Sequence, residues 1–456
     1  MKRKLCPGLF GTLQARSLAG TLACLTVLAA APAAAGTRTA PVPVPAALET
    51  PALFDDDAGG NADGDDPAIW AHPREAGAGL VIATKKDAGL SVYDLSGRER
   101  QAVAAPPAPG PGDAPGRFNN VDLLYGAGPG GADLAVVSDR GHDRLRIYTI
   151  DPHAALRGAP PLRDVTAAGV PFLFSADQSE VNEEATAYGL ATWLDRSTNR
   201  MYAMVSRNDH TSVAMAELVS AGGRVGYRVV DGIDLPHTFT LPDGTAWRPC
   251  GEPGELPQVE GMVVDRERGV LYAAQEDVGI WRVPVRGGFG TARIVDRVRE
   301  YGVPWTYDAA ADECVVHRDD DPGYGGRHLS ADAEGLTIYY AEDREGYLLA
   351  SGQGDDTFTV YDREPGNAFV GAFTVAGGRT DGVQESDGAD VLNVDLGGRF
   401  DEGLLVVHDG RNTPEVIGPD GEPRANTNFK YVPWDAVAGA FPDELTVDPG
   451  GWDPRD

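Results

Sequence analysis

A hairpin repeat occurs six times along the chain: an apolar strand, a polar turn of two to four residues, and a second apolar strand. The copies begin at Leu80 (LVIATKKDAGLSVYDL), Leu134 (LAVVSDRGHDRLRIYTI), Met201 (MYAMVSRNDHTSVAMAEL), Val270 (VLYAAQEDVGIWRVPV), Tyr347 (YLLASGQGDDTFTVYD) and Leu404 (LLVVHDGRN). They start 54 to 77 residues apart, whereas a minimal four-stranded propeller blade needs about 40 to 50 residues. Because one blade cannot bury both of its faces alone, the repeats predict a single all-β domain, a six-bladed β-propeller with inserted loops.

Each hairpin is preceded by another strand that begins with acidic or amide residues. These strands read DDPAIW at Asp65, NNVDLLY at Asn119, EEATAYGLATWL at Glu183, VEGMVV around Glu260, AEGLTIYY around Glu334 and DGADVLNV at Asp387. Neighbouring strands of a blade run antiparallel, so the start of the first strand and the end of the second lie at the same end of the blade. The face predicted at that end collects Asp65, Asp66, Asp122, Glu183, Glu184, Glu260, Asp332, Glu334, Asp387 and Asp390 from the strand starts, and Lys85, Lys86, Arg140, Arg207 and Glu276 from the turns.

Carboxylates at this density predict a cation site. Like charges a few ångströms apart repel by several kcal/mol at protein-like dielectric, so the carboxylates cannot all stay ionised without counter-cations. Oxygen ligands without Cys or His favour Ca²⁺ over zinc or copper. The interleaved Lys and Arg side chains would then face an anionic substrate that bridges to the metal ions.

The first 35 residues are predicted to be a secretory signal peptide, because basic residues precede an apolar run from Leu18 to Ala30 and a small-residue end at Ala33–Ala35. A weak lipoprotein-like sequence ends at Cys24, but most of the apolar run follows that cysteine, which argues against lipidation. Removing the four basic residues of this segment changes the net charge from −30 to −34 (−30 − 4). A secreted, strongly acidic protein of this kind is expected to bind cations and to avoid nucleic acid and membranes.

The rest of the chain is predicted to comprise an extended or partly disordered arm over residues 36–62 and the propeller over residues 63–456. Pro- and Gly-rich loops over 104–116, 238–256 and 301–328 interrupt the blade rhythm. Two of these loops contain Cys250 and Cys314, the two cysteines beyond the signal peptide. In an exported protein such a pair favours a disulfide over a catalytic thiol.

Several motifs argue against other functions. The glycine-rich segment 126–131 fits a dinucleotide fingerprint in its letters, but a strand follows it where that site needs a helix. HExxH, GxSxG and CxxC are absent and the eight histidines are scattered, so zinc hydrolase and serine esterase chemistry lack their usual signals. Trp70, Trp193, Trp281 and Trp434 recur at similar places in their strands and are expected to pack between blades.

Seven segments together resemble one known family. They are ADGDDPAIW, KKDAGLSVYDL, FNNVDLLY, VEGMVVDRERGVLYAAQEDVGIW, DAEGLTIYYAEDREGYLLASGQG, TDGVQESDGADVL and NFKYVPW, in order from about Asp63 to Asp435. They look like the β-propeller phytases, which are secreted, calcium-dependent alkaline phytases of the 3-phytase type. The resemblance implies the same six-bladed fold, several bound Ca²⁺ ions, and phytate or calcium-phytate and inorganic phosphate as substrate and product.

Carried over position by position, the resemblance implies roles for individual residues. Phosphate binding in catalysis is implied for Lys85, Arg140 and Tyr188, and a second pocket that only holds substrate is assigned to Lys86 and Arg207. Calcium ligation in the central channel is implied for Asp65, Asp66, Glu260, Glu276, Asp332 and Glu334, and a structural calcium site for Asp381, Asp387 and Asn412. Arg207 stands where the family usually has Lys, and Arg411 stands where an acidic ligand usually precedes the Asn. Glu49 of the arm matches a further ligand.

The expected mechanism is in-line attack of a calcium-bound water on phosphorus, with Glu260 fixing the water and the cationic side chains stabilising the charge on the phosphoryl oxygens. Two alternatives remain at this stage. A calcium-dependent propeller lactonase would also place carboxylates around a metal but would not need the neighbouring Lys and Arg. A non-catalytic calcium-dependent binding propeller would bind its ligand without releasing phosphate. The mature protein is expected to be a monomer.

Overall fold

A computed structural model describes residues 40–56, 60–311, 313–418 and 421–455. Contacts group residues 38–456 into one compact unit, and the predicted signal peptide lies outside the described residues. Within the described ranges, none of the helices has the length and apolar character needed to cross a membrane.

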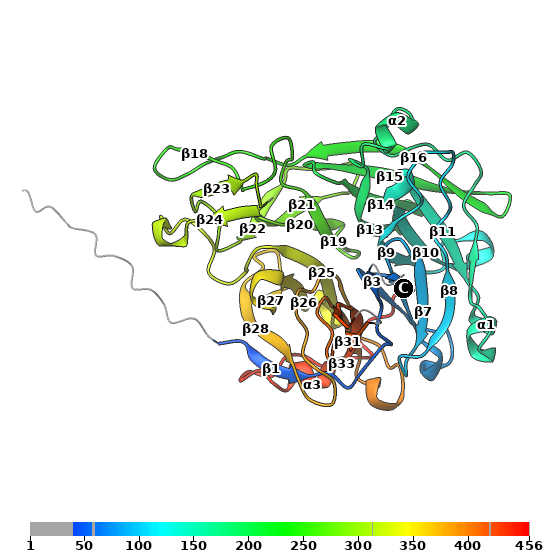
Figure 1. The fold of residues 1–456 in the computed structure, drawn as a ribbon. Coiled ribbons are helices and arrows are strands. Elements are labelled where there is room, and N and C mark those ends of the chain that lie inside the picture. Colours follow the sequence, from blue (N-terminus) through cyan, green and yellow to red (C-terminus); the bar gives the residue numbers. More distant parts are fainter. Residues whose placement is uncertain (1–39, 57–59, 312, 419–420, 456) are drawn as a thin grey trace, which may run out of the picture. The chain divides into compact units, whose positions relative to one another are not determined.

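Six sheets form the six blades, five of them with four strands and one with five, and this confirms the predicted six-bladed β-propeller. Blade 1 holds β5 (Pro67–Trp70), β6 (Leu80–Thr84), β7 (Leu90–Asp94) and β8 (Glu99–Val103); blade 2 holds β9 (Phe118–Leu124), β10 (Asp133–Asp139), β11 (Arg144–Ile150) and β12 (Leu162–Asp164); blade 3 holds β13 (Ala187–Asp195), β14 (Arg200–Arg207), β15 (Ser212–Ala221) and β16 (Arg224–Asp234). Blade 4 holds β19 (Val259–Asp265), β20 (Val270–Gln275), β21 (Gly279–Pro284) and β22 (Arg293–Arg297); blade 5 holds β25 (Ala333–Tyr340), β26 (Gly346–Gly352), β27 (Thr357–Asp362) and β28 (Phe369–Ala376); blade 6 holds β29 (Ala389–Leu392), β30 (Leu404–Asp409), β33 (Asn428–Pro433) and β2 (Leu48–Glu49). Successive blades follow one another in sequence order in Figure 1.

The N-terminal arm closes the ring of blades. Its strand β2 pairs antiparallel with β33 and becomes the outermost strand of blade 6. Its strand β1 (Val42–Pro45) pairs in parallel with β28 and adds a fifth strand to blade 5, as Figure 1 shows. The two ends of the chain therefore share a sheet, so the propeller cannot open without breaking main-chain hydrogen bonds.

The remaining elements lie in connections between the blade strands. Four short hairpins are formed by β3 (Asp55–Asp56) with β4 (Gly60–Asn61), β17 (Phe239–Thr240) with β18 (Ala246–Trp247), β23 (Trp305–Asp308) with β24 (Glu313–Val316), and β31 (Val416–Ile417) with β32 (Pro423–Arg424). The short helices are α1 (Pro152–Arg157), α2 (Gln178–Val181) and α3 (Trp434–Ala438), with 3-10 turns at Ala76–Ala78, Pro129–Gly131, Arg140–His142, Arg318–Asp320, Glu342–Arg344, Gln353–Asp355 and Gly398–Phe400. The glycine-rich segment 126–131 is a turn between β9 and β10, as expected.

The first two strands of each blade are mostly buried, because neighbouring blades cover both faces of each sheet there. All eight residues of β25 are buried, and so are all six residues of β20. The four recurring tryptophans are at most 5% exposed, which confirms that they pack in the core between blades.

The outermost strand of one blade ends on the same face as the inner strand of the next blade begins. We call this end of the propeller the site face. The connections 235–258, between blades 3 and 4, and 298–332, between blades 4 and 5, both lie on it. Cys250 and Cys314 form the predicted disulfide between these two connections.

Candidate active site

Four inner strands begin with a β-bulge, and the bulges of blades 3, 4 and 5 each place a polar side chain followed by glycine toward the centre of the site face. The pairing register shifts between Ala187 and Leu190 in blade 3, between Val259 and Met262 in blade 4, and between Ala333 and Leu336 in blade 5. The residues inside these bulges are Tyr188-Gly189, Glu260-Gly261 and Glu334-Gly335. A bulge leaves its extra residue out of the ladder and turns its side chain, which is how adjacent blades direct their acids to one point.

The glycine of each pair lets the next inner strand approach. A Cβ atom on Gly189 would lie 1.9 Å from the carbonyl oxygen of Glu260, and one on Gly261 would lie 1.9 Å from the carbonyl oxygen of Glu334. The third, at Gly335, would lie 3.0 Å from the carbonyl oxygen of Asp387. Only glycine tolerates the two closest approaches, so the polar-Gly repeat brings the carboxylates of blades 4, 5 and 6 together.

The centre of the site is a triad of carboxylates from blades 4 and 5. Oxygens of Glu260, Glu276 and Glu334 lie within 4.8 Å of one another. The Tyr188 hydroxyl donates to Glu260 Oε2 at 2.9 Å, and the Asn119 amide donates to Glu260 Oε1 at 2.9 Å. Gln258 Nε2 donates to Glu276 Oε2 at 3.2 Å. Polar side chains thus orient the triad, but they satisfy only part of its lone pairs.

The triad and Asp65 fit a hard divalent cation. Both carboxylate oxygens of Asp65, Oε1 of Glu276 and Oε2 of Glu334 are buried without a hydrogen-bond partner. Burial, together with the charge of Glu260, raises the pKa of Asp65, Glu276 and Glu334 well above the usual range. Unpartnered buried carboxylate oxygens are costly unless a cation ligates them, and an all-oxygen donor set is the one that Ca²⁺ prefers.

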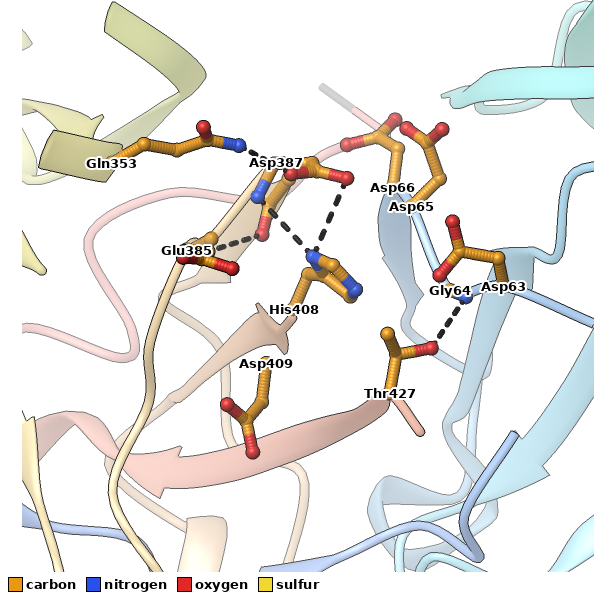
Figure 2. Close-up of polar contacts among 12 residues, drawn as sticks. Asp63, Gly64, Asp65, Asp66, Gln353, Glu385, Asp387, His408, Asp409 and Thr427 are labelled. Atoms are coloured by element: carbon orange, nitrogen blue, oxygen red, sulfur yellow. Dashed lines mark hydrogen bonds and ion pairs between the residues drawn. The ribbon is translucent and has the colours of Figure 1, made fainter. Parts of the chain in front are cut away.

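Lys86 lies within this acidic group. Its ammonium is 2.6 Å from Asp63, 3.6 Å from Asp387 and 3.9 Å from Asp65. Burial opposes its charge, but the carboxylates outweigh burial and raise the pKa of Lys86. Figure 2 shows Asp63, Asp65 and Asp387, and the contact of Asp387 with His408. Lys86 therefore provides a positive charge for three carboxylates, which lie at the starts of blades 1 and 6.

The other predicted phosphate-binding cations come from the ends of the second strands, or the turns after them, in blades 1, 2 and 3. The guanidinium of Arg140, from the blade 2 turn, lies 5.2 Å from the ring centroid of Tyr188. Arg207, from blade 3, donates from Nε to the carbonyl of Ala185 at 2.8 Å and lies over the ring of Phe174. The ammonium of Lys85 lies 3.7 Å from Glu99 of β8, and burial lowers its pKa.

A pair of carboxyl groups lies beside Glu276. Asp277, in the blade 4 turn, and Asp332, before β25, are in side-chain contact. Burial, with the charge of Asp332, raises the pKa of Asp277 well above the usual range, and burial also raises the pKa of Asp332. Asp332 thus lies at the edge of the predicted metal site, next to an acid that the sequence interpretation did not include.

Three of the predicted site-face acids lie elsewhere, which corrects the expectation that all strand-start acids converge. These acids are Asp66, Asp122 and Asp390, which lie close to one another inside the channel. Burial, with the charges of Asp390 and Asp122, raises the pKa of Asp66, and burial, with the charge of Asp122, raises the pKa of Asp390. Asp66 accepts from the Val121 amide at 3.0 Å, and Asp122 lies 3.3 Å from the guanidinium of Arg266. Because a strand rises by about 3.3 Å per residue, acids further along an inner strand lie deeper in the channel than the acids at its start.

The three residues predicted to form a structural calcium site are divided between two clusters. Asp387 belongs to the Lys86 group, and Gln353 donates to it at 2.6 Å (Figure 2). Asp381 and Asn412 instead contact the fully buried ammonium of Lys430, which also contacts Glu49 of the arm and Asp409. Lys430 already supplies a cation there, so this arrangement does not fit a calcium site shared by all three residues.

The sequence interpretation missed Asn119, Gln258 and Asp277 in the site, and Asp63 beside Lys86. It also missed the reason that the acids converge, although the signal was present: Tyr-Gly, Glu-Gly, Glu-Gly and Asp-Gly recur at the starts of four inner strands. A glycine at the same place in successive repeats indicates a close backbone approach.

Comparisons with known proteins agree with this geometry. The sequence profile of the phytase family matches residues 12–235 and 299–456. The 3-phytase of Bacillus subtilis (strain 168) is 31% identical over 398 residues, which cover 85% of this chain and 84% of that protein.

Matches to solved structures are more distant. The crystal structure of BBS1N in complex with ARL6DN matches with a TM-score of 0.38 and 11% identity, covering 80% of this chain and 78% of that one. A protein from Lactobacillus plantarum matches with a TM-score of 0.37 and 11% identity, covering 66% and 69%. Neither match is close enough to support a conclusion about this protein. The family profile and the Bacillus relative span most of the chain, and the protein belongs to the phytase family.

Proposed function

We propose that this protein is a secreted, calcium-dependent phosphomonoesterase that hydrolyses phytate, myo-inositol hexakisphosphate, to lower inositol phosphates and phosphate. The observation that carries the proposal is the convergence of unpartnered buried carboxylate oxygens beside the ammonium of Lys86, in a chain that belongs to the phytase family. The similarity to a Bacillus 3-phytase supports phytate as the substrate. The disulfide supports an oxidising compartment.

We assign calcium to Asp65, Glu260, Glu276, Asp332 and Glu334. Calcium bound there would neutralise phosphoryl oxygens and make a coordinated water easier to deprotonate. Bound calcium would also offset the repulsion between the carboxylates and would ligate their unpartnered oxygens. Asp381 and Asn412 remain candidates for a separate calcium site. That site would bind calcium more weakly, because Lys430 competes for their oxygens.

The side chains around the triad would position the scissile phosphate. Glu260 would orient the attacking water, because its two oxygens already accept from Tyr188 and Asn119 and its remaining lone pairs face the site. Arg140, which lies against the Tyr188 ring, would donate to the equatorial phosphoryl oxygens and stabilise their growing charge. Lys85 would complete this set once its contact with Glu99 is exchanged for substrate.

A second group would hold a neighbouring phosphate without cleaving it. Lys86 and Arg207 are the candidates, and they lie on opposite sides of the Arg140 turn in the order of the blades. The guanidinium of Arg207 is fixed by the Ala185 carbonyl and the Phe174 ring, so little conformational entropy is lost when it binds a phosphate. Substrates with adjacent phosphates would benefit most.

The decisive experiment measures phosphate release from inositol hexakisphosphate by the wild-type protein and by Glu260→Gln, each with calcium and with chelator. The substitution keeps the shape of the side chain but removes a charge, so kcat is expected to fall by about 10³-fold or more with the fold intact. Glu217→Gln is the matched control, because Glu217 is a buried, ion-paired glutamate on β15 away from the site.

Three results would overturn the proposal. Wild-type activity that is unaffected by chelation would remove calcium from the mechanism. Full activity in Glu260→Gln would remove the assigned role of that residue. Hydrolysis of lactones without phosphate release, or phytate binding without turnover, would replace the proposed reaction with one of the two alternative functions.

A further inference from the structure

A cavity of about 450 Å³ adjoins the acidic site on the side of blades 3 to 5. Its inner wall consists of site residues, including Gln258, Glu276, Asp277 and Asp332. Its outer wall is made by the other lining residues of the connections 235–258 and 298–332, which contribute aromatic side chains, one arginine and the carboxylates of Glu252, Glu255 and Glu300. The volume is within the range of small-molecule binding pockets, about 300–1,000 Å³, and the outer wall differs from the inner one by its aromatic rings and its guanidinium.

The two connections behave as one rigid element, which we call the loop pair. The disulfide between Cys250 and Cys314 joins them. The indole of Trp247 donates to the Val303 carbonyl at 2.9 Å, and that of Trp305 donates to the Arg248 carbonyl at 2.7 Å. Each hydrogen bond crosses from one connection to the other, so the outer wall is fixed before any ligand binds.

The loop pair is also anchored to the site. The Leu256 amide donates to the Asp209 carbonyl at 3.0 Å, and the Asp209 amide donates to Gln258 Oε1 at 2.8 Å. Gln258 in turn donates to Glu276 of the triad. The outer wall is therefore held in register with the carboxylates, and a ligand placed on the triad extends toward the loop pair at a defined position.

Arg248 is the residue of the outer wall with a clear preference for an anion. Among the residues that the structure describes, no carboxylate forms an ion pair with it, and the contact of its guanidinium is with the ring of Trp305, 5.7 Å from the centroid. An arginine supported by an aromatic ring and directed at a cavity is suited to bidentate recognition of phosphate. The indole faces beside it suit the C–H face of a saturated ring.

We infer that this cavity is an outer substrate subsite, in which Arg248 receives a phosphate group of an inositol polyphosphate while another phosphate of the same molecule is being hydrolysed. The inference rests on the proposed function and adds to it a specificity-determining residue on the loop pair. The acids of the inner wall repel free phosphate, so the subsite favours a ligand that is tethered through a second phosphate at the cation-loaded centre. A substrate with one phosphate cannot reach both walls.

The test compares Arg248→Met with Arg327→Met, a control on the other connection of the loop pair whose exposed side chain does not line the cavity. Methionine keeps much of the aliphatic stem, so the packing on Trp305 is preserved. In saturating calcium, Arg248→Met is expected to raise KM for inositol hexakisphosphate about tenfold, the loss expected for one hydrogen bond to a charged group. Its kcat, and both constants for p-nitrophenyl phosphate, should stay within twofold of wild type, as should all constants of Arg327→Met.

A binding measurement separates this inference from the proposed function. Myo-inositol hexasulfate carries the same ring of anionic esters, and calorimetry should show about tenfold weaker binding to Arg248→Met than to wild type in calcium. If the wild type releases no phosphate from either substrate but this difference persists, the subsite stands and the proposed reaction fails. If KM for both substrates changes equally, or if neither KM nor hexasulfate affinity changes, the subsite is absent.

A second variant tests the rigid wall itself. Cys250→Ser/Cys314→Ser keeps Arg248 but removes the cross-link, so the arginine is no longer held in place. KM for inositol hexakisphosphate should rise severalfold while the constants for p-nitrophenyl phosphate and the far-ultraviolet circular dichroism spectrum remain unchanged. An unchanged KM for the hexakisphosphate would show that the loop pair does not position the substrate.

Discussion

At the scale of single residues, the site depends on charges that the protein compensates only in part. Lys86 is the clearest case, because one ammonium serves Asp63, Asp65 and Asp387. Where the sequence predicted a side chain that contacts substrate, the structure adds a counter-ion for three carboxylates. Both roles are compatible if calcium takes over the carboxylates and leaves Lys86 to turn toward phosphate.

Lys86→Met should therefore reveal a calcium-dependent loss of stability. Without calcium, the variant leaves three carboxylates without their cation, and removing one partner of a buried ion pair costs about 3–5 kcal/mol, less here because the side chain is partly exposed. Thermal melts in chelator should show a fall in Tm of several degrees relative to wild type, and melts in saturating calcium a smaller fall. Arg98→Met, at an exposed pair with Asp94, is the control. An equal fall in both conditions would contradict the shared role.

Asp390 in the channel should make stability depend on pH. Burial, with the nearby charge of Asp122, raises the pKa of Asp390 to about 7. A raised pKa means that the folded state binds the proton more tightly than the unfolded state, so this group's contribution is fully present below about pH 4 and is lost as pH rises toward 7. Asp390→Asn can keep both contacts, accepting from Ile69 and donating to Thr337.

The variant Asp390→Asn should accordingly be more stable than wild type at pH 8 and closer to it at pH 5. Urea unfolding at the two pH values, in chelator so that calcium does not contribute, measures the difference. A variant that is equally stabilised or destabilised at both pH values would show that Asp390 does not titrate in this range.

At the scale of elements, bulge and glycine together decide where the acids point. Three inner strands shift register at a polar-Gly pair, and the absent side chain lets the next strand come close. The same device explains why the inner strands can form a narrow ring although each is covered on both faces by large side chains.

Gly261→Ala should disrupt this element. The new Cβ would lie 1.9 Å from the carbonyl oxygen of Glu334, so strands β19 and β25 must separate, and overpacking of this kind costs about 1–3 kcal/mol. Activity should fall by more than tenfold, because Glu260 and Glu334 move apart. Gly232→Ala in β16 is the matched control, since its Cβ would have no neighbour closer than 3.7 Å. A Gly261→Ala protein with wild-type Tm and activity would refute the close-approach argument.

At the scale of the whole molecule, the propeller concentrates charge at one end and closes its ring with the arm. Net charge is −30 over the full sequence, and the unpartnered carboxylates lie where blades meet. A ligand that binds only the folded state stabilises by mass action, by about 2.7 kcal/mol per site at a concentration of 100 Kd. Calcium at the centre should therefore couple the blades to one another.

Chelation should lower Tm markedly and in one cooperative transition, because the blades share the ions. Differential scanning calorimetry in calcium and in excess chelator measures the shift. Adding calcium back should restore Tm, and magnesium should not do so fully, because Mg²⁺ demands a smaller octahedral site and dehydrates reluctantly. An unchanged Tm in chelator would exclude several bound calcium ions.

The sequence by itself determined the blade count, the order of the strands, the face that carries Glu260, Glu276 and Glu334, and the pairing of Cys250 with Cys314. These follow from local periodicity and from the antiparallel geometry of a blade, which hold wherever the strands pack. Only the tertiary structure decided which acids meet. It placed Asp66, Asp122 and Asp390 at a different level of the channel and put Asp387 and Asp381 in separate clusters. It also made the loop pair a wall of the site. The physical reason is that the distances between blades depend on bulges, on closely approaching glycines and on closure of the ring.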